Sequence, residues 1–324
     1  MRPKLEALNL NFLQTSPQPI FIAGPTAVGK SAVALEVAAR LDGEIISVDS
    51  MQVYRGLDLG TAKPDPAEQK KIPHHLIDIA NLDEAFDAAK FCRLAEKAVA
   101  EIQSRHRRPI FCGGTGFYFK ASLEGLGEAP PANLLLRAEL EKLSDAELLA
   151  ELQKRDAIAF EKIDRRNRRR LLRAVEVIRL TEKPFSGRRA DWSGAVRKNS
   201  FTVSGFGLTR SNSDLHARIN QRVDEMFARG LVAETENLLQ SGLEKNQTAM
   251  QAIGYRQVVG HLRGERPLPE TIELVKIRTR QFAKRQMTWF RRQMQLDWIH
   301  LHADFGATEA ANQIVDFCAR GKLR

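Results

Sequence analysis

The feature that most constrains the fold of this chain is a loop near its N-terminus, Gly24-Pro-Thr-Ala-Val-Gly29-Lys30-Ser31. It has the spacing G-x-x-x-x-G-K-S, follows a short apolar run at Pro19 to Ala23, and opens a helical pattern that continues to Leu41. In that context the glycines let backbone N–H groups approach phosphate oxygens, and the helix N-terminus adds a favourable dipole. Lys30 supplies a positive charge, and Ser31 can ligate Mg²⁺. The sequence therefore predicts a site for a diphosphate group.

Short runs of β-forming residues alternate with long helical patterns along most of the chain. The runs are Pro19 to Ala23, Glu44 to Val48, Pro109 to Cys112, Phe201 to Leu208 and Trp298 to Leu301. This alternation predicts an α/β fold of the P-loop type, in which a mostly parallel sheet is flanked by helices.

One long segment lacks such runs. Between Gly125 and Ser200 the sequence is helical and highly charged, and turn residues mark both of its edges. We therefore expect a P-loop core with C-terminal helices, formed by residues 1–124 and 200–324, and a helical insertion domain at residues 125–199.

The charge of the chain favours an acidic partner. Its 324 residues carry a formal net charge of +10, with a pI near 9.7. Nucleic acid is the leading candidate, and an anionic membrane surface or simple solubility are the rivals. The three cysteines, Cys92, Cys112 and Cys318, have no paired spacing, which fits a reducing compartment. No stretch approaches the ~20 apolar residues that a bilayer span needs. Together with the cysteines, this predicts a cytoplasmic protein. We also expect a monomer.

A carboxylate and a glycine-rich turn follow two further predicted strands. Asp49 ends the run at Glu44 to Val48, and ligands of open α/β folds bind at the carboxyl ends of strands. Its spacing alone fits a Mg²⁺ ligand as well as another catalytic role. The turn Gly113-Gly-Thr115-Gly116 is either a tight strand-to-helix turn or a place where the backbone approaches a ligand.

Two helical patterns carry a basic face. In the insertion, Arg166, Arg169, Arg170 and Arg173 share a face by i, i+3, i+4 and i+7 spacing. Near the C-terminus, one helical arc contains Arg280, Gln281, Lys284, Arg285, Thr288, Arg291, Arg292 and Gln295, and the opposite arc contains Phe282, Met287, Trp289, Phe290 and Met294. A basic helical face is usually only solvated. Two of them in a basic chain with a phosphate loop favour contact with nucleic acid.

These features leave three classes of function open. The loop fits a small-molecule or nucleotide kinase of the P-loop class as well as an enzyme that uses another diphosphate. A non-catalytic RNA-binding protein would explain the basic helices but would leave the loop and Asp49 unused. Mg²⁺-dependent ATP binding in a calorimetric titration, without binding of another diphosphate compound, would identify the kinase.

The motifs taken together resemble those of the bacterial tRNA dimethylallyltransferases, also called isopentenyl-diphosphate:tRNA transferases. The matching segments run in order over almost the whole chain: Gly24 to Ser31, Asp49 to Tyr54, Gly60 to Pro64, Pro73 to Leu76, Gly113 to Gly116, Arg173 to Val177, Arg218 to Asp224, Ile253 to Arg256 and Thr279 to Arg291.

The resemblance implies a prenyltransferase that moves a dimethylallyl group from dimethylallyl diphosphate to N6 of adenine 37 in the anticodon loop of tRNA, with Mg²⁺ as cofactor. It implies that Asp49 is the general base and that Thr115 is its hydrogen-bonding helper. Diphosphate-binding residues would be Gly24, Thr26, Ala27, Val28, Gly29, Lys30, Ser31 and Arg222, with Ser31 also the Mg²⁺ ligand. tRNA-binding residues would be Ser50, Met51, Gln52, Arg169, Arg170, Arg173, Gln251, Gly254, Tyr255, Arg256, Lys284, Arg285, Thr288 and Arg291. The insertion domain would thus contact the tRNA.

Overall fold

The structure of the protein is a computed structural model that describes residues 17–126, 130–187, 204–302 and 306–321. The chain divides into two compact units, one formed by Asn9–Ser122 with Phe201–Arg324 and the other by Leu123–Ser200. The first three residues of the strand predicted at Phe201 to Leu208 lie outside the described residues. In the described part of the chain, no helix is both long and apolar enough to span a bilayer.

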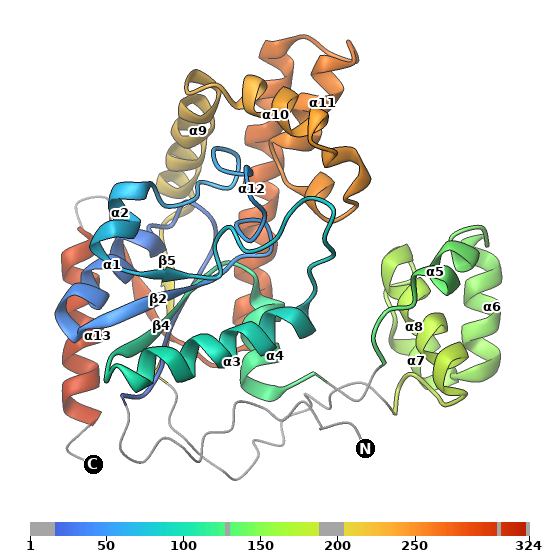
Figure 1. Cartoon of the computed structure of the whole chain (residues 1–324), viewed down its shortest axis with the longest axis horizontal. Helices are drawn as coiled ribbons and strands as arrows, with labels where there is room; N and C mark the ends of the chain where they lie inside the picture. The colour runs from blue at the N-terminus through green and yellow to red at the C-terminus, as the bar shows by residue number, and fades with distance from the viewer. Residues whose placement is uncertain (1–16, 127–129, 188–203, 303–305, 322–324) are drawn as a thin grey trace. The chain divides into compact units, whose positions relative to one another are not determined.

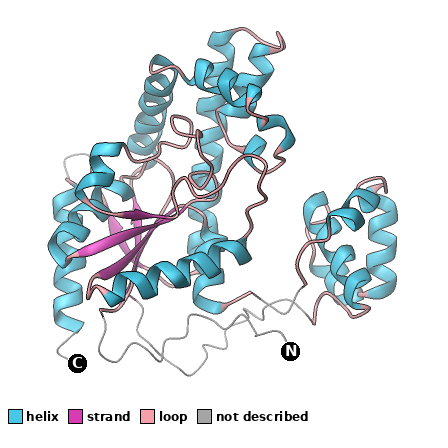
Figure 2. Ribbon diagram, in the orientation of Figure 1, coloured by secondary structure: helices cyan, strands magenta, loops and turns pink. Residues whose placement is uncertain are grey.

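The larger unit is built on a six-stranded sheet with the strand order β3-β2-β4-β1-β5-β6. The strands are β1 (Ile20–Ala23), β2 (Gly43–Val48), β3 (His74–His75), β4 (Arg108–Gly113), β5 (Ser204–Thr209) and β6 (Asp297–His300). All described pairs of neighbouring strands are parallel, and helices flank the sheet (Figure 2). The predicted fold class is therefore confirmed.

Strand β3 was not predicted, because its two histidines do not form an apolar run. It pairs with β2 through Ile45 and Ile46. His75 Nε2 lies 2.7 Å from the carboxylate of Glu44, which is itself 1% exposed and also receives two hydrogen bonds from Arg105. Although burial by itself raises the pKa of Glu44, the hydrogen bonds from Arg105 and His75 hold it at about 2. Polar pairing thus stabilises this edge of the sheet.

Helices cover both faces of the sheet. They are α1 (Lys30–Leu41), α2 (Pro66–Lys71), α3 (Ala88–Ser104), α4 (Gly116–Glu124), α9 (Asn212–Ala228), α10 (Leu231–Gln240), α11 (Tyr255–Leu262), α12 (Leu268–Gln293) and α13 (Ala307–Gly321), with 3-10 turns η2 (Leu243–Lys245) and η3 (Ala249–Gln251). Helices α1 and α13 lie side by side, as do α9 and α12 (Figure 1).

Side chains alternate along the central strands and supply a core on each face. Ile20, Ile22 and Ile110 belong to a buried cluster with residues of α1, α9 and α13. Phe21 and Phe111, the intervening residues, stack with ring centroids 4.6 Å apart, and aromatic residues of α4 and α12 pack next to them. This explains why the central strands are apolar throughout instead of alternating in polarity.

The smaller unit consists of α5 (Leu134–Leu140), α6 (Asp145–Arg155), α7 (Ala157–Lys162) and α8 (Arg168–Thr181). Its buried core is formed by Leu140, Leu148, Leu152, Ala159, Leu171, Ala174, Val175 and Ile178. A capping box of Ser144 with Glu147 begins α6, and Asn167 caps α8. The unit therefore has a hydrophobic core of its own.

Three neighbouring strands of the larger unit end at the same level. Gly113 at the end of β4 pairs with Val48 at the end of β2 on one side and with Ala23 at the end of β1 on the other. The chain segments that follow these strands are the phosphate loop, the segment that starts at Asp49, and the turn that contains Thr115. The register therefore places these segments at one edge of the sheet.

Candidate active site

The phosphate loop has a backbone conformation that depends on its two glycines. Gly29, the residue before α1, has a φ of 109°, which L side chains rarely adopt. A Cβ atom on Gly24 would lie 2.8 Å from the carbonyl oxygen of Leu208 in β5. The sequence motif is therefore required both by the turn into the helix and by the neighbouring strand.

Three basic side chains donate hydrogen bonds to carbonyl oxygens of the loop. The bonds are Lys30 Nζ to Pro25 O (2.6 Å), Arg218 Nε to Ala27 O (3.0 Å) and Arg210 Nε to Val28 O (2.8 Å). Arg218 lies on α9, and Arg210, which follows β5, is 7% exposed and pairs with Asp214. These bonds fix the carbonyl side of the loop. The N–H of Thr26 donates to Gln286 Oε1, and the remaining N–H groups of the loop are the ones that could bind an anion.

The ammonium of Lys30 has an unusual pKa. Removal from water lowers the pKa of Lys30 to about 8, and the nearby Arg222 contributes in the same direction, while Cys112 and Asp49 oppose the shift. A phosphate group placed beside this ammonium would favour its charged form. Anion binding and protonation of Lys30 are therefore linked.

Asp49 is held by the backbone that follows it. Its Oδ1 accepts hydrogen bonds from the N–H groups of Met51 (2.8 Å) and Gln52 (3.3 Å). Its Oδ2 makes no hydrogen bond to any residue that the structure describes. The charge of Asp49 raises the pKa of both Lys30 and Arg222, so the carboxylate lies within electrostatic range of both cations. A fixed carboxylate with a free oxygen can accept a proton from a ligand bound there.

Thr115 is connected to the backbone beside Asp49. Its N–H donates to Val48 O at 3.1 Å, and its Oγ1 accepts a hydrogen bond from the N–H of Ser50 at 3.2 Å. The predicted pair of Asp49 and Thr115 is thus brought together by adjacent strand ends.

The glycines beside Thr115 are packed closely against other parts of the protein, so that none of them has room for a side chain. A Cβ atom would lie 2.1 Å from Val48 O at Gly113, 2.3 Å from Gln286 Nε2 at Gly114, and 2.1 Å from Trp289 Cε3 at Gly116. Of the two interpretations of this turn, the structure favours the tight turn, packed between β2 and α12.

Arg222 bridges two loops at the site. Its guanidinium donates to Thr26 Oγ1 and to Thr61 O, each at 3.4 Å. Removal from water lowers the pKa of Arg222, and Asp49 opposes this shift. An arginine nevertheless stays charged near neutral pH. Arg222, which was predicted to bind diphosphate, therefore lies against the phosphate loop as a cation.

Gln52 supports the segment around Thr61. Its Oε1 accepts a hydrogen bond from Ser47 Oγ at 2.8 Å, and its Nε2 donates to Thr61 O (3.2 Å) and Ala62 O (3.3 Å). Both ends of the Gln52 side chain are thus engaged within the protein, whereas Ser50 and Met51 are half-buried. The tRNA contacts of these three residues stay a prediction.

Two residues predicted to contact tRNA lie beneath the surface. Tyr255 is fully buried, and its hydroxyl donates to Glu234 (2.5 Å) and accepts from the N–H of Gly60 (3.1 Å). Gly254 is buried at the start of α11. Their burial was not predicted, and the tRNA contacts of these two residues stay a prediction. Their predicted companions Gln251 and Arg256 are exposed.

Arg173 makes contacts within the smaller unit that were not predicted. It donates to Glu176 at 2.6 Å and to Pro130 O at 2.5 Å, and Glu176 is completely buried in the smaller unit. Arg173 thus supports the smaller unit, while its side chain is still 28% exposed, and its tRNA contact stays a prediction. Arg169 and Arg170, on the same helix, are exposed.

Helix α12 presents a cationic face much as predicted. Lys284, Arg285, Thr288 and Arg291 are exposed, and none of the three cations forms an ion pair with a carboxylate among the described residues. Phe282, expected on the packed side, is instead 37% exposed beneath the guanidinium of Arg285. Met294 and Gln295 lie beyond the end of the helix at Gln293.

The buried stripe of α12 contains a long polar side chain, that of Gln286, which was not predicted to belong to the site. The stripe consists of Thr271, Val275, Ala283, Gln286 and Phe290. A long polar side chain at such a position is the signal that could have identified Gln286.

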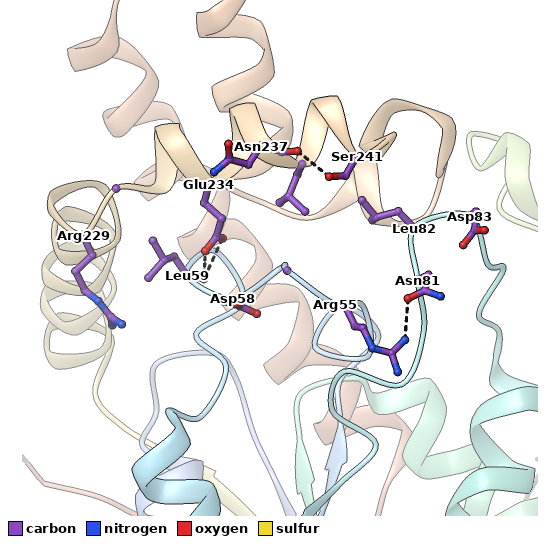
Figure 3. Close-up of a pocket in the computed structure, with 13 residues that line it drawn as sticks. Arg55, Asp58, Leu59, Asn81, Leu82, Asp83, Arg229, Glu234, Asn237 and Ser241 are labelled. Atoms are coloured by element: carbon purple, nitrogen blue, oxygen red, sulfur yellow. Dashed lines mark hydrogen bonds between the residues drawn. The ribbon is translucent and has the colours of Figure 1, made fainter.

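A cavity of about 840 Å³ lies beside the segment that contacts Arg222. Figure 3 shows Glu234, from α10, accepting hydrogen bonds from the N–H of Leu59, and Arg55 paired with Asn81. None of the predicted site residues lines this cavity. The hydrogen bonds from Leu59 to Glu234 in its wall instead anchor the segment that leads to Thr61.

The fold and the site together define a P-loop α/β protein with a carboxylate beside its anion-binding loop. A family model described as IPP transferase matches residues 52–293. The chain therefore belongs to the IPP transferase family.

Individual relatives agree with this family. The chain is 46% identical over 287 residues to tRNA dimethylallyltransferase 1 of Trichlorobacter lovleyi, a match that covers 87% of this chain and 93% of the relative. It is 42% identical to the tRNA dimethylallyltransferase of Geobacter metallireducens, over 88% of this chain and 93% of that protein.

Solved structures are similar as well. The tRNA isopentenylpyrophosphate transferase of Bacillus halodurans is 37% identical, with a TM-score of 0.69 over 95% of this chain and 99% of that one. A eukaryotic dimethylallyltransferase, described as acting on tRNA, is 26% identical, with a TM-score of 0.73 over 94% of this chain and 78% of that one.

Proposed function

We propose that this chain transfers a dimethylallyl group from dimethylallyl diphosphate to N6 of adenine 37 in the anticodon loop of tRNA, releasing diphosphate. The observation that carries the proposal is the placement of a free carboxylate oxygen on Asp49 within range of Lys30 and Arg222 at an anion-binding loop. One edge of the sheet thus offers a base for the acceptor and cations for the leaving group. The names of the relatives support the same reaction.

Asp49 removes the proton in the proposed reaction. The exocyclic amine of adenine is a weak nucleophile because its lone pair is delocalised into the ring. As its nitrogen bonds to the allylic carbon, Oδ2 of Asp49 accepts the departing proton. Thr115, through Ser50, holds the backbone next to this carboxylate. An adenine in the anticodon loop is stacked, so it must leave the stack to reach Asp49.

The cations and amides of the loop act on the leaving group. When the allylic C–O bond breaks, the electron pair goes to the diphosphate, and positive charge spreads over the isoprenoid. Lys30, Arg222 and the loop N–H groups stabilise the diphosphate most strongly when this charge is greatest.

We also propose Mg²⁺ as the cofactor, with the hydroxyl of Ser31 as its ligand from the protein. Ser31 is exposed in the first turn of α1. A hydroxyl combined with diphosphate oxygens and waters is a donor set that suits Mg²⁺, which usually keeps several waters and binds through substrate phosphates. When bound, the ion would neutralise charge on the diphosphate.

Incubation with labelled dimethylallyl diphosphate and unmodified tRNA, followed by mass analysis of the nucleosides, tests the proposal directly. The expected result is N6-(dimethylallyl)adenosine at a single position of the anticodon loop. ATP turnover with no transfer of label to tRNA would instead indicate a P-loop kinase.

The affinity for dimethylallyl diphosphate is expected to fall as the pH rises above about 8. The pKa of Lys30 in the free protein is about 8, so its ammonium loses its proton above this pH, whereas bound diphosphate favours the protonated form. Below that pH the ammonium is already charged, so this dependence disappears. The decline can reach about tenfold per pH unit, because each deprotonation must be reversed on binding.

Calorimetric titration of the donor at several pH values measures this effect. Lys30→Arg is the matched control, because its guanidinium stays charged over the same range. An affinity of the wild type that is independent of pH, or an equal decline in the control, would contradict the assignment.

Removal of two cations from α12 is expected to weaken tRNA binding. Lys284→Ala combined with Arg291→Ala should reduce the dependence of log affinity on log salt by up to about one unit for each side chain that binds a phosphate. The affinity for the donor should not change. Titrations of tRNA at several salt concentrations provide the measurement.

Arg93 and Lys97 offer a control of equal charge. Both are exposed on α3, a different helix from α12, and neither is predicted to contact RNA. Their double alanine variant should retain the wild-type salt dependence. If plots of log tRNA affinity against log salt concentration coincide for the α12 variant and this control, the cations of α12 are only solvated.

A further inference from the structure

The side chain of Gln286 joins two parts of the candidate site. It projects from the buried face of α12 and is 8% exposed. Its Oε1 accepts a hydrogen bond from the N–H of Thr26 at 2.8 Å, and its Nε2 donates to the carbonyl of Gly114 at 2.9 Å. One amide group therefore spans the phosphate loop and the turn that carries Thr115.

The fit around this amide is close. A Cβ atom on Gly114 would lie 2.3 Å from Gln286 Nε2, so the residue opposite the amide must lack a side chain. One turn further along α12, Trp289 meets Gly116 in the same way. The helix is therefore seated on the turn at two successive points, which fixes where Gln286 can reach.

We propose that Gln286 is a positioning residue for the transfer reaction, an inference that rests on the proposed function. A series of contacts runs from Thr26 through Gln286 to Gly114, and from the next residue, Thr115, to Ser50 beside Asp49. The amide thus sets the separation between the anion-binding loop and the base. Small displacements of reacting groups cost much of the rate of an oriented reaction.

The chemistry of the side chain explains why glutamine is needed. The N–H of Thr26 requires an acceptor and the carbonyl of Gly114 requires a donor, and a primary amide supplies one of each. Leucine satisfies neither, and an ionised glutamate satisfies only Thr26. Since Gln286 is buried, its role differs from that of Lys284 and Arg291 on the exposed face of the same helix.

Gln286→Leu and Gln286→Glu test the proposal, with Gln313→Glu on the exposed surface of α13 as the matched control. Both Gln286 variants should lose on the order of tenfold or more in kcat and in affinity for inorganic diphosphate, because buried polar groups are left without hydrogen-bond partners. Their affinity for tRNA should stay within a few-fold of the wild type. Loss of tRNA affinity alone would make Gln286 an RNA contact and overturn the proposal.

The pH profile separates positioning from general loss of structure. Burial raises the pKa of a carboxyl group, and the carboxyl introduced by Gln286→Glu regains a donor for Gly114 once it is protonated. The rate of Gln286→Glu relative to the wild type should therefore rise as the pH falls, whereas the relative rate of Gln286→Leu should stay flat. Equal pH dependence of the two variants would count against a role of the hydrogen bonds from Gln286 to Thr26 and Gly114.

A double-mutant cycle with Gly114 gives a second test that does not depend on either variant alone. Gly114→Ala should be strongly impaired, because its new Cβ meets the Gln286 amide. In a Gln286→Ala background that collision is gone, so the added methyl should have little further effect. Additive losses would overturn the proposed contact.

The outcomes also separate this inference from the proposed function. If the wild type modifies tRNA and the Gln286 variants match it in turnover and diphosphate affinity, only the inference fails. If the wild type transfers no dimethylallyl group but the Gln286 variants still lose diphosphate affinity, the proposed function is wrong, and the role of Gln286 in positioning the phosphate loop is supported.

Discussion

Replacement of Asp49 with asparagine is expected to lower the rate of dimethylallyl transfer by about 10²-fold or more, the usual contribution of a general base. Asparagine keeps an oxygen for the N–H groups of Met51 and Gln52, so the local turn should survive. It presents an amide in place of the free Oδ2 and cannot accept the proton. Single-turnover rates at saturating donor and tRNA measure the effect.

Affinity for both substrates is the control for this variant. Since Asp49→Asn removes a negative charge beside Lys30 and Arg222, diphosphate affinity should be equal to or tighter than that of the wild type. tRNA affinity should change by no more than a few-fold. A near-normal single-turnover rate would remove Asp49 from the role of base.

Replacement of Lys30 with alanine is expected to reduce kcat/KM for the donor by about 10²- to 10³-fold, as is typical when a group that stabilises transition-state charge is removed. The loss should appear in both the donor affinity and the chemical step, because in the proposed reaction the ammonium contacts phosphate before and during C–O cleavage. Steady-state kinetics with varied donor and saturating tRNA give both quantities.

Lys97→Ala, at an exposed site on α3, controls for the loss of one positive charge. The thermal stability of Lys30→Ala should also be checked, because Lys30 Nζ bonds to Pro25 within the loop. If a folded Lys30→Ala variant bound and used the donor normally, the loop would serve another ligand.

Much of the fold could be predicted because the strands of a buried parallel sheet are apolar on both faces. The loop at Gly24 to Ser31 is a local signal, and it placed the first strand and the start of α1 correctly. The short strand at His74 and His75 had no such signal, since its two side chains make polar contacts, His74 with the carbonyl of Ile72 and His75 with Glu44.

The positions of candidate site residues could be predicted where regular strand pairing determines them, and could not where they depend on side-chain contacts between distant segments. Asp49 and Thr115 could be placed because parallel strands bring their carboxyl ends together. Tyr255 could not, because its burial depends on Glu234 from a different helix. Gln286 was missed for the same reason, as its two partners lie far from it in the sequence.

Helix α12 has a consequence for how the two proposed substrates influence each other. Its buried face contacts the phosphate loop through Gln286, while its exposed face carries Lys284 and Arg291. Diphosphate in the loop and tRNA on the cations would therefore act on one continuous helix. By thermodynamic linkage, any factor by which bound tRNA changes the affinity for dimethylallyl diphosphate must equal the factor by which the diphosphate changes the affinity for tRNA.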